Sequence, residues 1–167
     1  MNKRENIKDI NDSQVFIVED NDMHSLMMDY MLSNETMAHI RKFKSGEECI
    51  ENLSLKPDVV ILDYGLPGIN GMETLLAIKE YNPELPVIVI TGSHDRHVAQ
   101  KFLNAGVYDY IEKDDDGFEQ VGKVTDNIIN LLLRKKDKKR HKQNLVFIGV
   151  ALILAALVFI TYLLSRN

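Results

Sequence analysis

Short apolar runs alternate along residues 13–133 with segments that have helical periodicity. Three of the runs, VFIV, VVIL and VIVI, are apolar at every position. Strands of this kind are covered on both faces, as in a parallel sheet that lies between two layers of helices. The pattern predicts five strands, at residues 14–18, 39–43, 59–62, 87–90 and 108–111.

Helices are predicted between and after these strands, at residues 23–32, 45–55, 70–81 and 96–105, with a last helix from about residue 118. Ser45 with Glu48, and Asn70 with Glu73, have the spacing of a capping box at a helix start. Gly106 is typical of the residue that ends a helix. Repeated strand–helix units require right-handed crossovers, so the sequence predicts an α/β domain with a doubly wound parallel sheet.

Residues 145–164, LVFIGVALILAALVFITYLL, carry no formal charge. A helix rises 1.5 Å per residue, so this segment would span about 30 Å, the thickness of a bilayer's hydrocarbon core. A buried core helix is the alternative, but a domain of this size cannot bury a helix that is apolar all round. We therefore expect a single transmembrane helix at residues 145–164.

Charge is distributed unevenly around this segment. In residues 1–133 acidic side chains outnumber basic ones about two to one, whereas residues 134–142, RKKDKKRHK, are strongly basic. The positive-inside rule then places residues 1–142 on the cytoplasmic side of the cell membrane, with residues 165–167 outside. The basic run is expected to contact anionic membrane lipid, and no nucleic acid is expected as a partner because the run abuts the bilayer.

The remaining composition limits the alternatives. Cys49 is the only cysteine, so no internal disulfide can form, which agrees with a reducing cytosol. It lies in a segment of helical pattern, which favours core packing over a catalytic thiol. Residues 1–12 have no apolar core, so we expect a flexible N-terminus and no secretory signal peptide.

Polar residues follow four of the predicted strands. Glu19 and Asp20 come after the first, Asp63 after the third, Thr91 after the fourth and Lys113 after the fifth. Ligands bind at this edge of a doubly wound sheet. Clustered carboxylates repel one another, and a hard cation such as Mg²⁺ relieves the repulsion. A carboxylate beside it can attack phosphorus, while Lys113 and Thr91 neutralise the phosphoryl oxygens. Taken singly, each residue could belong to a turn, cap a helix or lie on the surface. Their joint placement at successive strand ends favours a site for Mg²⁺ and a phosphoryl group.

These residues lie in segments that resemble a known family. The stretch PDVVILDYGLPGINGMETL is similar to the phosphorylation-site segment of bacterial response-regulator receiver domains, and VFIVEDN, VIVITGS and YDYIEK match as well. The resemblance implies a flavodoxin-like five-stranded sheet of order 2-1-3-4-5 in residues 13–133. Around it the expected parts are a flexible N-terminus (1–12), a basic juxtamembrane linker (134–144), the transmembrane helix (145–164) and a tail (165–167).

The resemblance also implies a role for each site residue. Asp63 would be the phosphoacceptor, with Thr91 and Lys113 contacting the phosphoryl oxygens. Thr91 would also act with Tyr110 as the switch pair. The implied Mg²⁺ ligands are Glu19, Asp20, Asp63 and the backbone carbonyl of Gly65.

Two positions depart from the family pattern. The acidic pair is Glu19-Asp20 rather than two aspartates, and Lys113 is followed by Asp114 rather than proline. The family's usual cis peptide after the lysine is not expected here, because a cis bond to a residue other than proline costs about 3 kcal/mol.

The resulting functional hypothesis is a membrane-anchored receiver that accepts a phosphoryl group from a histidine kinase or phosphotransfer protein. It would act on an unidentified downstream protein rather than on DNA, because the segments after the receiver leave no room for a DNA-binding domain. Self-catalysed phosphorylation of Asp63 and its hydrolysis would be its only chemistry, so we do not expect an enzyme. Ala151 and Ala155 form a small-xxx-small pair compatible with a homodimer.

Two alternatives stay open. The first is an adaptor that is never phosphorylated and uses the receiver fold as a membrane-tethered docking surface. The second is a phosphatase that forms an aspartyl phosphate, which the sequence disfavours because Tyr64 and Gly65 follow Asp63 without a second acid at Asp-x-Asp spacing.

Overall fold

The computed structural model describes residues 13–92 and 95–165, without the side chains of residues 155–164. The predicted flexible N-terminus (1–12) and tail residues 166–167 lie outside the described residues. The chain divides into two compact units, residues 1–131 and residues 132–167. The first unit holds the sheet and is the one that positions the site.

The sheet has five parallel strands, as the apolar runs predict. The strands are β1 (Gln14–Val18), β2 (His39–Phe43), β3 (Val59–Asp63), β4 (Val87–Thr91) and β5 (Asp109–Glu112). Their order is β2-β1-β3-β4-β5, with parallel pairing throughout. The predicted strand number, direction and order are confirmed. The fifth strand begins one residue later than predicted, at Asp109.

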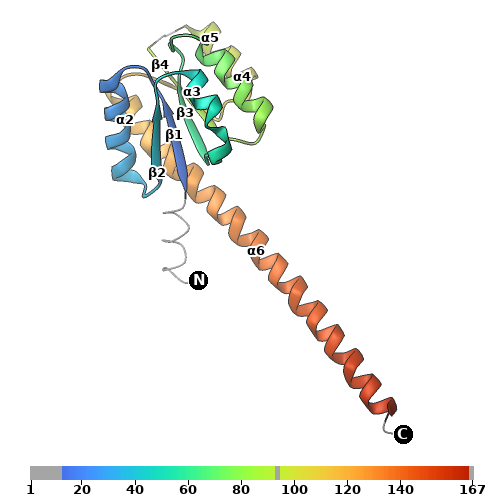
Figure 1. Cartoon of the computed structure of the whole chain (residues 1–167). Coiled ribbons are helices and arrows are strands. Elements are labelled where there is room, and N and C mark those ends of the chain that lie inside the picture. Colours follow the sequence, from blue (N-terminus) through green and yellow to red (C-terminus); the bar gives the residue numbers. More distant parts are fainter. Residues whose placement is uncertain (1–12, 93–94, 166–167) are drawn as a thin grey trace. The chain divides into compact units, whose positions relative to one another are not determined.

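The helices cover both faces of the sheet. They are α2 (Asp22–Glu35), α3 (Gly46–Glu51), α4 (Gly71–Tyr81), α5 (Arg96–Asn104) and α6 (Asp115–Ser165). Figure 1 shows α3, α4 and α5 on one side of the sheet, and α2 with the first turns of α6 on the other. At Gly122 of α6 a Cβ atom would lie only 3.1 Å from Glu35 Cγ, so α2 and α6 pack closely.

The core lies along the central strands. Every residue of β3 and β4 is buried, and so is every residue of β1 after Gln14. Each large apolar side chain that is fully buried contributes about 1.5–3 kcal/mol to folding. The edge strands β2 and β5 are exposed or partly exposed, apart from Ile111, which is buried. Cys49 is fully buried, and burial raises the pKa of its thiol to about 12, so the predicted packing role fits.

Of the two predicted capping boxes, the one at α4 is complete and the one at α3 has only its serine half. At α4 the Asn70 side chain accepts hydrogen bonds from the backbone of Met72 and Glu73, and the Glu73 carboxylate accepts one from the backbone of Asn70. At α3 the Ser45 hydroxyl accepts from the backbone of Glu48. The Glu48 carboxylate, however, accepts from the backbone of Lys44, one residue earlier than a capping box requires.

The second predicted helix is shorter than expected. It ends at Glu51, and a separate 3₁₀ turn, η1 (Leu53–Leu55), follows it. Lys56 then adopts a left-handed conformation, with φ of 57°. The residue before a proline is disfavoured in the right-handed helical region, and Pro57 follows Lys56. The chain therefore leaves the helix before it can enter β3.

The last helix begins earlier than predicted, at Asp115, and continues as far as Ser165. Among the described residues, no helix contains a stretch that is both long and apolar enough to cross a membrane. The predicted transmembrane helix at residues 145–164 is thus not shown. The structure describes no side chains for residues 155–164, which make up half of that segment.

Candidate functional site

The carboxyl ends of the strands bring the predicted polar residues to one edge of the sheet. Asp63 and Thr91 are the last residues of β3 and β4, while Glu19 and Lys113 directly follow β1 and β5. Glu19, Asp63 and Thr91 are 2%, 5% and 1% exposed. Asp20 is exposed beside them. Polar groups this buried must find partners within the site, because water cannot reach them.

Three carboxylates converge at this edge. One oxygen from each of Glu19, Asp20 and Asp63 lies within 4.8 Å of the other two. Hard divalent cations such as Mg²⁺ prefer oxygen donors of this kind, so the donor set fits the ion. Gly65 lies against the same group, since a Cβ atom there would be 3.6 Å from Asp63 Oδ2. The backbone at position 65 therefore lies beside the Asp63 carboxylate.

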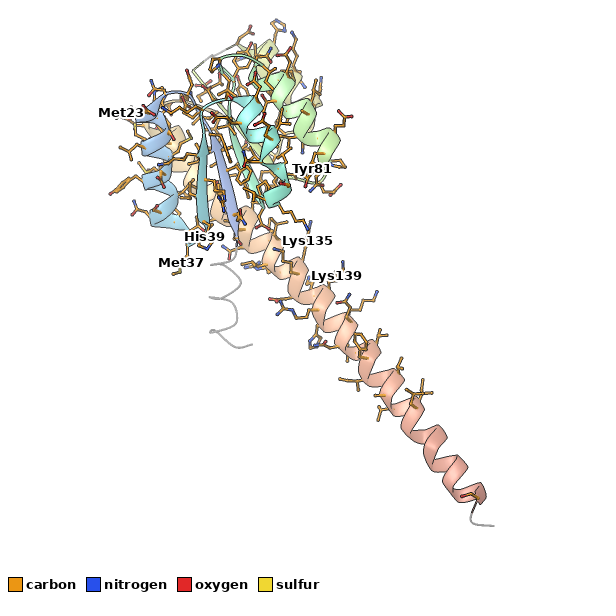
Figure 2. All side chains as sticks on the ribbon, in the orientation of Figure 1. Met23, Met37, His39, Tyr81, Lys135 and Lys139 are labelled. Atoms are coloured by element: carbon orange, nitrogen blue, oxygen red, sulfur yellow. The ribbon has the colours of Figure 1, made fainter. Side chains whose placement is uncertain are left out.

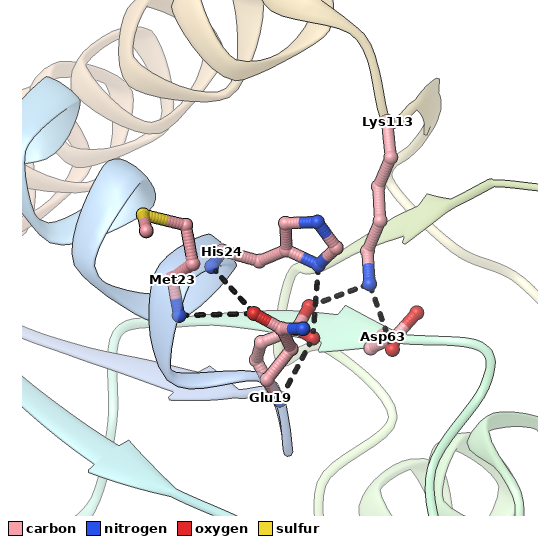
Figure 3. A network of polar contacts seen from close by, with 6 residues as sticks. Glu19, Met23, His24, Asp63 and Lys113 are labelled. Atoms are coloured by element: carbon pink, nitrogen blue, oxygen red, sulfur yellow. Dashed lines mark hydrogen bonds and ion pairs between the residues drawn. The ribbon is translucent and has the colours of Figure 1, made fainter.

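Lys113 reaches into the cluster from the end of β5. Its Nζ lies 2.6 Å from Glu19 Oε2 and 2.8 Å from Asp63 Oδ2 (Figure 3). The Lys113 side chain is only 10% exposed. Its backbone N–H donates to the carbonyl of Thr91 at 2.7 Å, which fixes the start of the side chain. One buried ammonium group thus balances part of the negative charge of two buried carboxylates.

The other oxygen of Glu19 has contacts of its own. Oε1 accepts a hydrogen bond from the backbone N–H of Asn21 at 3.2 Å and lies 3.4 Å from His24 Nδ1 (Figure 3). The His24 ring also packs near Phe118, with ring centroids 5.8 Å apart. The sequence reasoning did not single out His24. A usable signal was its place in the first turn of the helix that directly follows the acidic pair.

The two predicted switch residues are in contact. The side chains of Thr91 and Tyr110 form a hydrogen bond, and burial raises the pKa of the Tyr110 hydroxyl despite the opposite effect of that bond. The Tyr110 ring lies 5.9 Å from the ring of Phe102, which in turn lies 5.6 Å from the ring of Tyr64. The residue after Asp63 and the switch tyrosine therefore pack against the same buried side chain of α5.

Asp114 serves as a helix cap at the position where the family has proline. Its Oδ1 accepts a hydrogen bond from the backbone N–H of Gly117 at 2.7 Å, and its carbonyl accepts one from Phe118. The described residues contain no cis peptide bond, as expected from the sequence. A Cβ atom at Gly117 would lie 1.9 Å from the Glu112 carbonyl oxygen, so the turn after β5 needs glycine there. Lys113 reaches Asp63 without the proline.

The site residues predicted from the sequence are thus largely together. The structure gathers Glu19, Asp20, Asp63 and Lys113, and it places Gly65 against Asp63. Thr91 and Tyr110 form an adjacent pair at the ends of β4 and β5. The side chain of His24, which lies beside Glu19, was not predicted as part of the site.

Comparisons with known proteins agree with this geometry. The chain is 32% identical over 135 residues to a protein-glutamate methylesterase/protein-glutamine glutaminase of Clostridium acetobutylicum; the match covers 78% of this chain but only 37% of that protein. The structure resembles the Mn²⁺-bound response regulator Rcp1 (26% identity, TM-score 0.60, 67% of this chain and 91% of that one). It also resembles the BeF₃-activated DrrB receiver domain (25% identity, TM-score 0.65, 71% and 98%).

A family model described as the response regulator receiver domain matches residues 15–122, from β1 into the first turns of α6. This range includes all of the site residues described above and more than half of the chain. The chain therefore belongs to the response regulator receiver domain family of two-component signalling proteins.

Proposed function

We propose that this protein accepts a phosphoryl group on Asp63 from a histidine kinase or phosphotransfer protein. The observation that carries the proposal is the cluster of three carboxylates within 4.8 Å, two of which share the buried amine of Lys113. Receiver domains generally are signalling modules rather than enzymes, and they bind Mg²⁺ in an acidic pocket. Glu19, Asp20, Asp63 and the carbonyl of Gly65 are the groups that would hold the ion here.

Each residue has a defined part in the transfer. A carboxylate oxygen of Asp63 forms a bond to phosphorus as the bond from phosphorus to the donor's imidazole nitrogen breaks, and that nitrogen keeps the electron pair. When bound, Mg²⁺ neutralises charge on the carboxylates and on the phosphoryl oxygens. The Lys113 ammonium group, 2.8 Å from Asp63, stabilises a further phosphoryl oxygen, and the Thr91 hydroxyl donates a hydrogen bond to another.

The output passes through the switch pair. When Thr91 turns toward the phosphoryl group, it leaves its hydrogen bond with Tyr110, and the tyrosine ring turns inward. The surface formed by α5, β5 and the first turns of α6 is then repacked for a downstream protein. Contact with a protein rather than with DNA remains a prediction, because the chain spans only 37% of the curated relative.

The phosphorylation proposal is tested by intact-mass analysis of the full chain in detergent after incubation with acetyl phosphate and Mg²⁺. We expect the mass of one phosphoryl group to be gained, and the gain to be lost with EDTA or with Asp63→Asn. No gain by the wild-type chain under these conditions would support the adaptor alternative instead.

We also propose that residues 145–164 anchor the receiver in the cell membrane as a single span, with residues 1–142 in the cytoplasm. The support is the uncharged sequence itself together with the exposure of its first side chains: Leu145, Val146 and Phe147 are 60%, 60% and 73% exposed on α6. Lys135 and Lys139 of the basic linker (134–144) extend from the same helix into solvent (Figure 2), where they can contact anionic lipid.

The anchor is tested by membrane fractionation of the full chain and of a variant that ends at Asn144. We expect the full chain to stay with membranes after a high-salt wash, and the shortened chain to be released. If salt releases the full chain, the basic linker alone attaches it to the membrane. If the full chain is already in the soluble fraction at low salt, neither the span nor the basic linker attaches it.

A further inference from the structure

We infer that Glu47 is a positioning residue for the loop of residues 64–70, which joins the phosphoacceptor strand β3 to α4. The inference rests on the proposed function, because it concerns the same metal site. Glu47 lies in the first turn of α3, and its Oε1 accepts a hydrogen bond from the backbone N–H of Ile69 at 3.0 Å. This bond joins residues 22 positions apart in the sequence.

Glycines let α3 come this close to the loop. Gly68 has a φ of +76°, and a Cβ atom there would lie 2.4 Å from Glu47 Oε1. The carboxylate thus occupies the space that a side chain at position 68 would need. At Gly46 a Cβ atom would lie 2.0 Å from Thr74 Oγ1 and 2.8 Å from Ile69 Cγ1. The start of α3 is therefore in close contact with both the loop and α4.

The other end of the loop closes on the phosphoacceptor. The backbone N–H of Gly71 donates to the carbonyl of Tyr64 at 3.1 Å, and a Cβ atom at Gly71 would lie 2.5 Å from the Asp63 carbonyl oxygen. Gly65, whose carbonyl is the proposed Mg²⁺ ligand, lies within this closed loop. The position of the Gly65 carbonyl relative to the Asp63 carboxylate therefore depends on what holds the loop. The hydrogen bond from the loop to α3 is accepted by Glu47.

Because of where Glu47 lies, its removal is expected to affect the loop of residues 64–70 without lowering the overall stability of the fold. Its side chain is exposed, so water can replace the carboxylate at the Ile69 N–H if the side chain is removed. The hydrogen bond from Ile69 lowers the pKa of the Glu47 carboxyl, so the group is ionised at neutral pH. Removing it should loosen the loop and leave the buried core of the sheet intact.

The test compares the Mg²⁺ dissociation constant of the full chain in detergent, measured by titration calorimetry, for four proteins: wild type, Glu47→Ala, Glu47→Gln and Glu48→Gln. Glu48 is the matched control, because its carboxylate accepts a hydrogen bond from the backbone N–H of Lys44 rather than from the loop of residues 64–70. We expect Glu47→Ala to weaken binding roughly tenfold, the low end of what outer partners of metal ligands contribute. Glu47→Gln, which keeps an acceptor oxygen, should recover most of the affinity, and Glu48→Gln should match wild type.

A second readout excludes a general loss of structure. Hydrogen exchange of the loop amides should rise in Glu47→Ala, while the urea midpoint of unfolding stays close to that of the wild type. Glu47→Ala binding Mg²⁺ as tightly as wild type, or losing affinity only together with its unfolding midpoint, would overturn the inference and leave the proposed function standing. A wild-type chain that binds no Mg²⁺ would overturn both.

Discussion

At the scale of single residues, the amine of Lys113 holds together two carboxylates that would otherwise repel each other. Glu19 and Asp63 are both buried, and each lies within 2.8 Å of that amine. Removing one partner of a buried ion pair leaves uncompensated charge in a medium of low polarity, which costs more than the pair itself contributes. A metal ion bound to the same carboxylates would supply the missing positive charge.

We therefore predict that Lys113→Gln lowers the free energy of unfolding by about 3 kcal/mol in EDTA, and that saturating Mg²⁺ reverses part of the loss. Urea denaturation with and without Mg²⁺ measures both effects. The control is Lys123→Gln. Lys123 is exposed and pairs with Glu119 on the surface of α6, so its replacement should change the free energy of unfolding little in either buffer. Equal losses for the two variants would show that the pairing of Lys113 is not a buried one.

The residues of the site differ in how far the sequence could reveal them. Asp63, Thr91 and Lys113 were predictable because each ends or directly follows an apolar strand, and parallel strands end at one edge. The contacts of His24 and Glu47 could not be predicted from the sequence, because they depend on how α2 and α3 pack against the sheet. A carboxylate in a first helical turn, like Glu47, reads from sequence as a helix-dipole partner.

At the scale of secondary structure, the start of α4 connects the site to helix stability. The side chain of Asn70 accepts from two backbone N–H groups of the first turn, and Glu73 completes the capping box. Replacing a capping residue with alanine costs about 1 kcal/mol. We predict that Asn70→Ala lowers the free energy of unfolding by about this amount in a urea titration, because those N–H groups lose their acceptor.

The matched variant is Asn70→Ser, since serine is also a strong helix cap and should retain most of the stability. If serine and alanine at this position proved equally destabilising, the loss would come from the packing of the loop rather than from capping.

The helices and strands could be predicted from the sequence where burial determines them. Their ends were harder to predict where a local turn conformation determines them. Strands β3 and β4 are buried along their whole length, which is the property that their apolar runs indicate. The division of the second predicted helix into α3 and η1 was missed, because it depends on the backbone conformation of Lys56 before Pro57. The early start of α6 was also missed, because it depends on the Asp114 side chain, which caps the helix by accepting a hydrogen bond from the backbone N–H of Gly117.

At the scale of the whole molecule, the chain combines a receiver domain with a C-terminal segment of different composition. The receiver match ends at residue 122, and the basic and apolar segments lie beyond it. The match to the curated relative covers 78% of this chain but only 37% of that protein. The proposed function depends on the site at the strand ends, which lies within the range that the receiver model matches.

The most direct measurement is the identity of the phosphorylated residue in the full chain. After incubation with acetyl phosphate and Mg²⁺, borohydride reduction converts an aspartyl phosphate to homoserine, which peptide mass spectrometry can locate. We predict homoserine at Asp63, absent without Mg²⁺. Homoserine at another aspartate, or a phosphate on any side chain other than that of Asp63, would contradict the account.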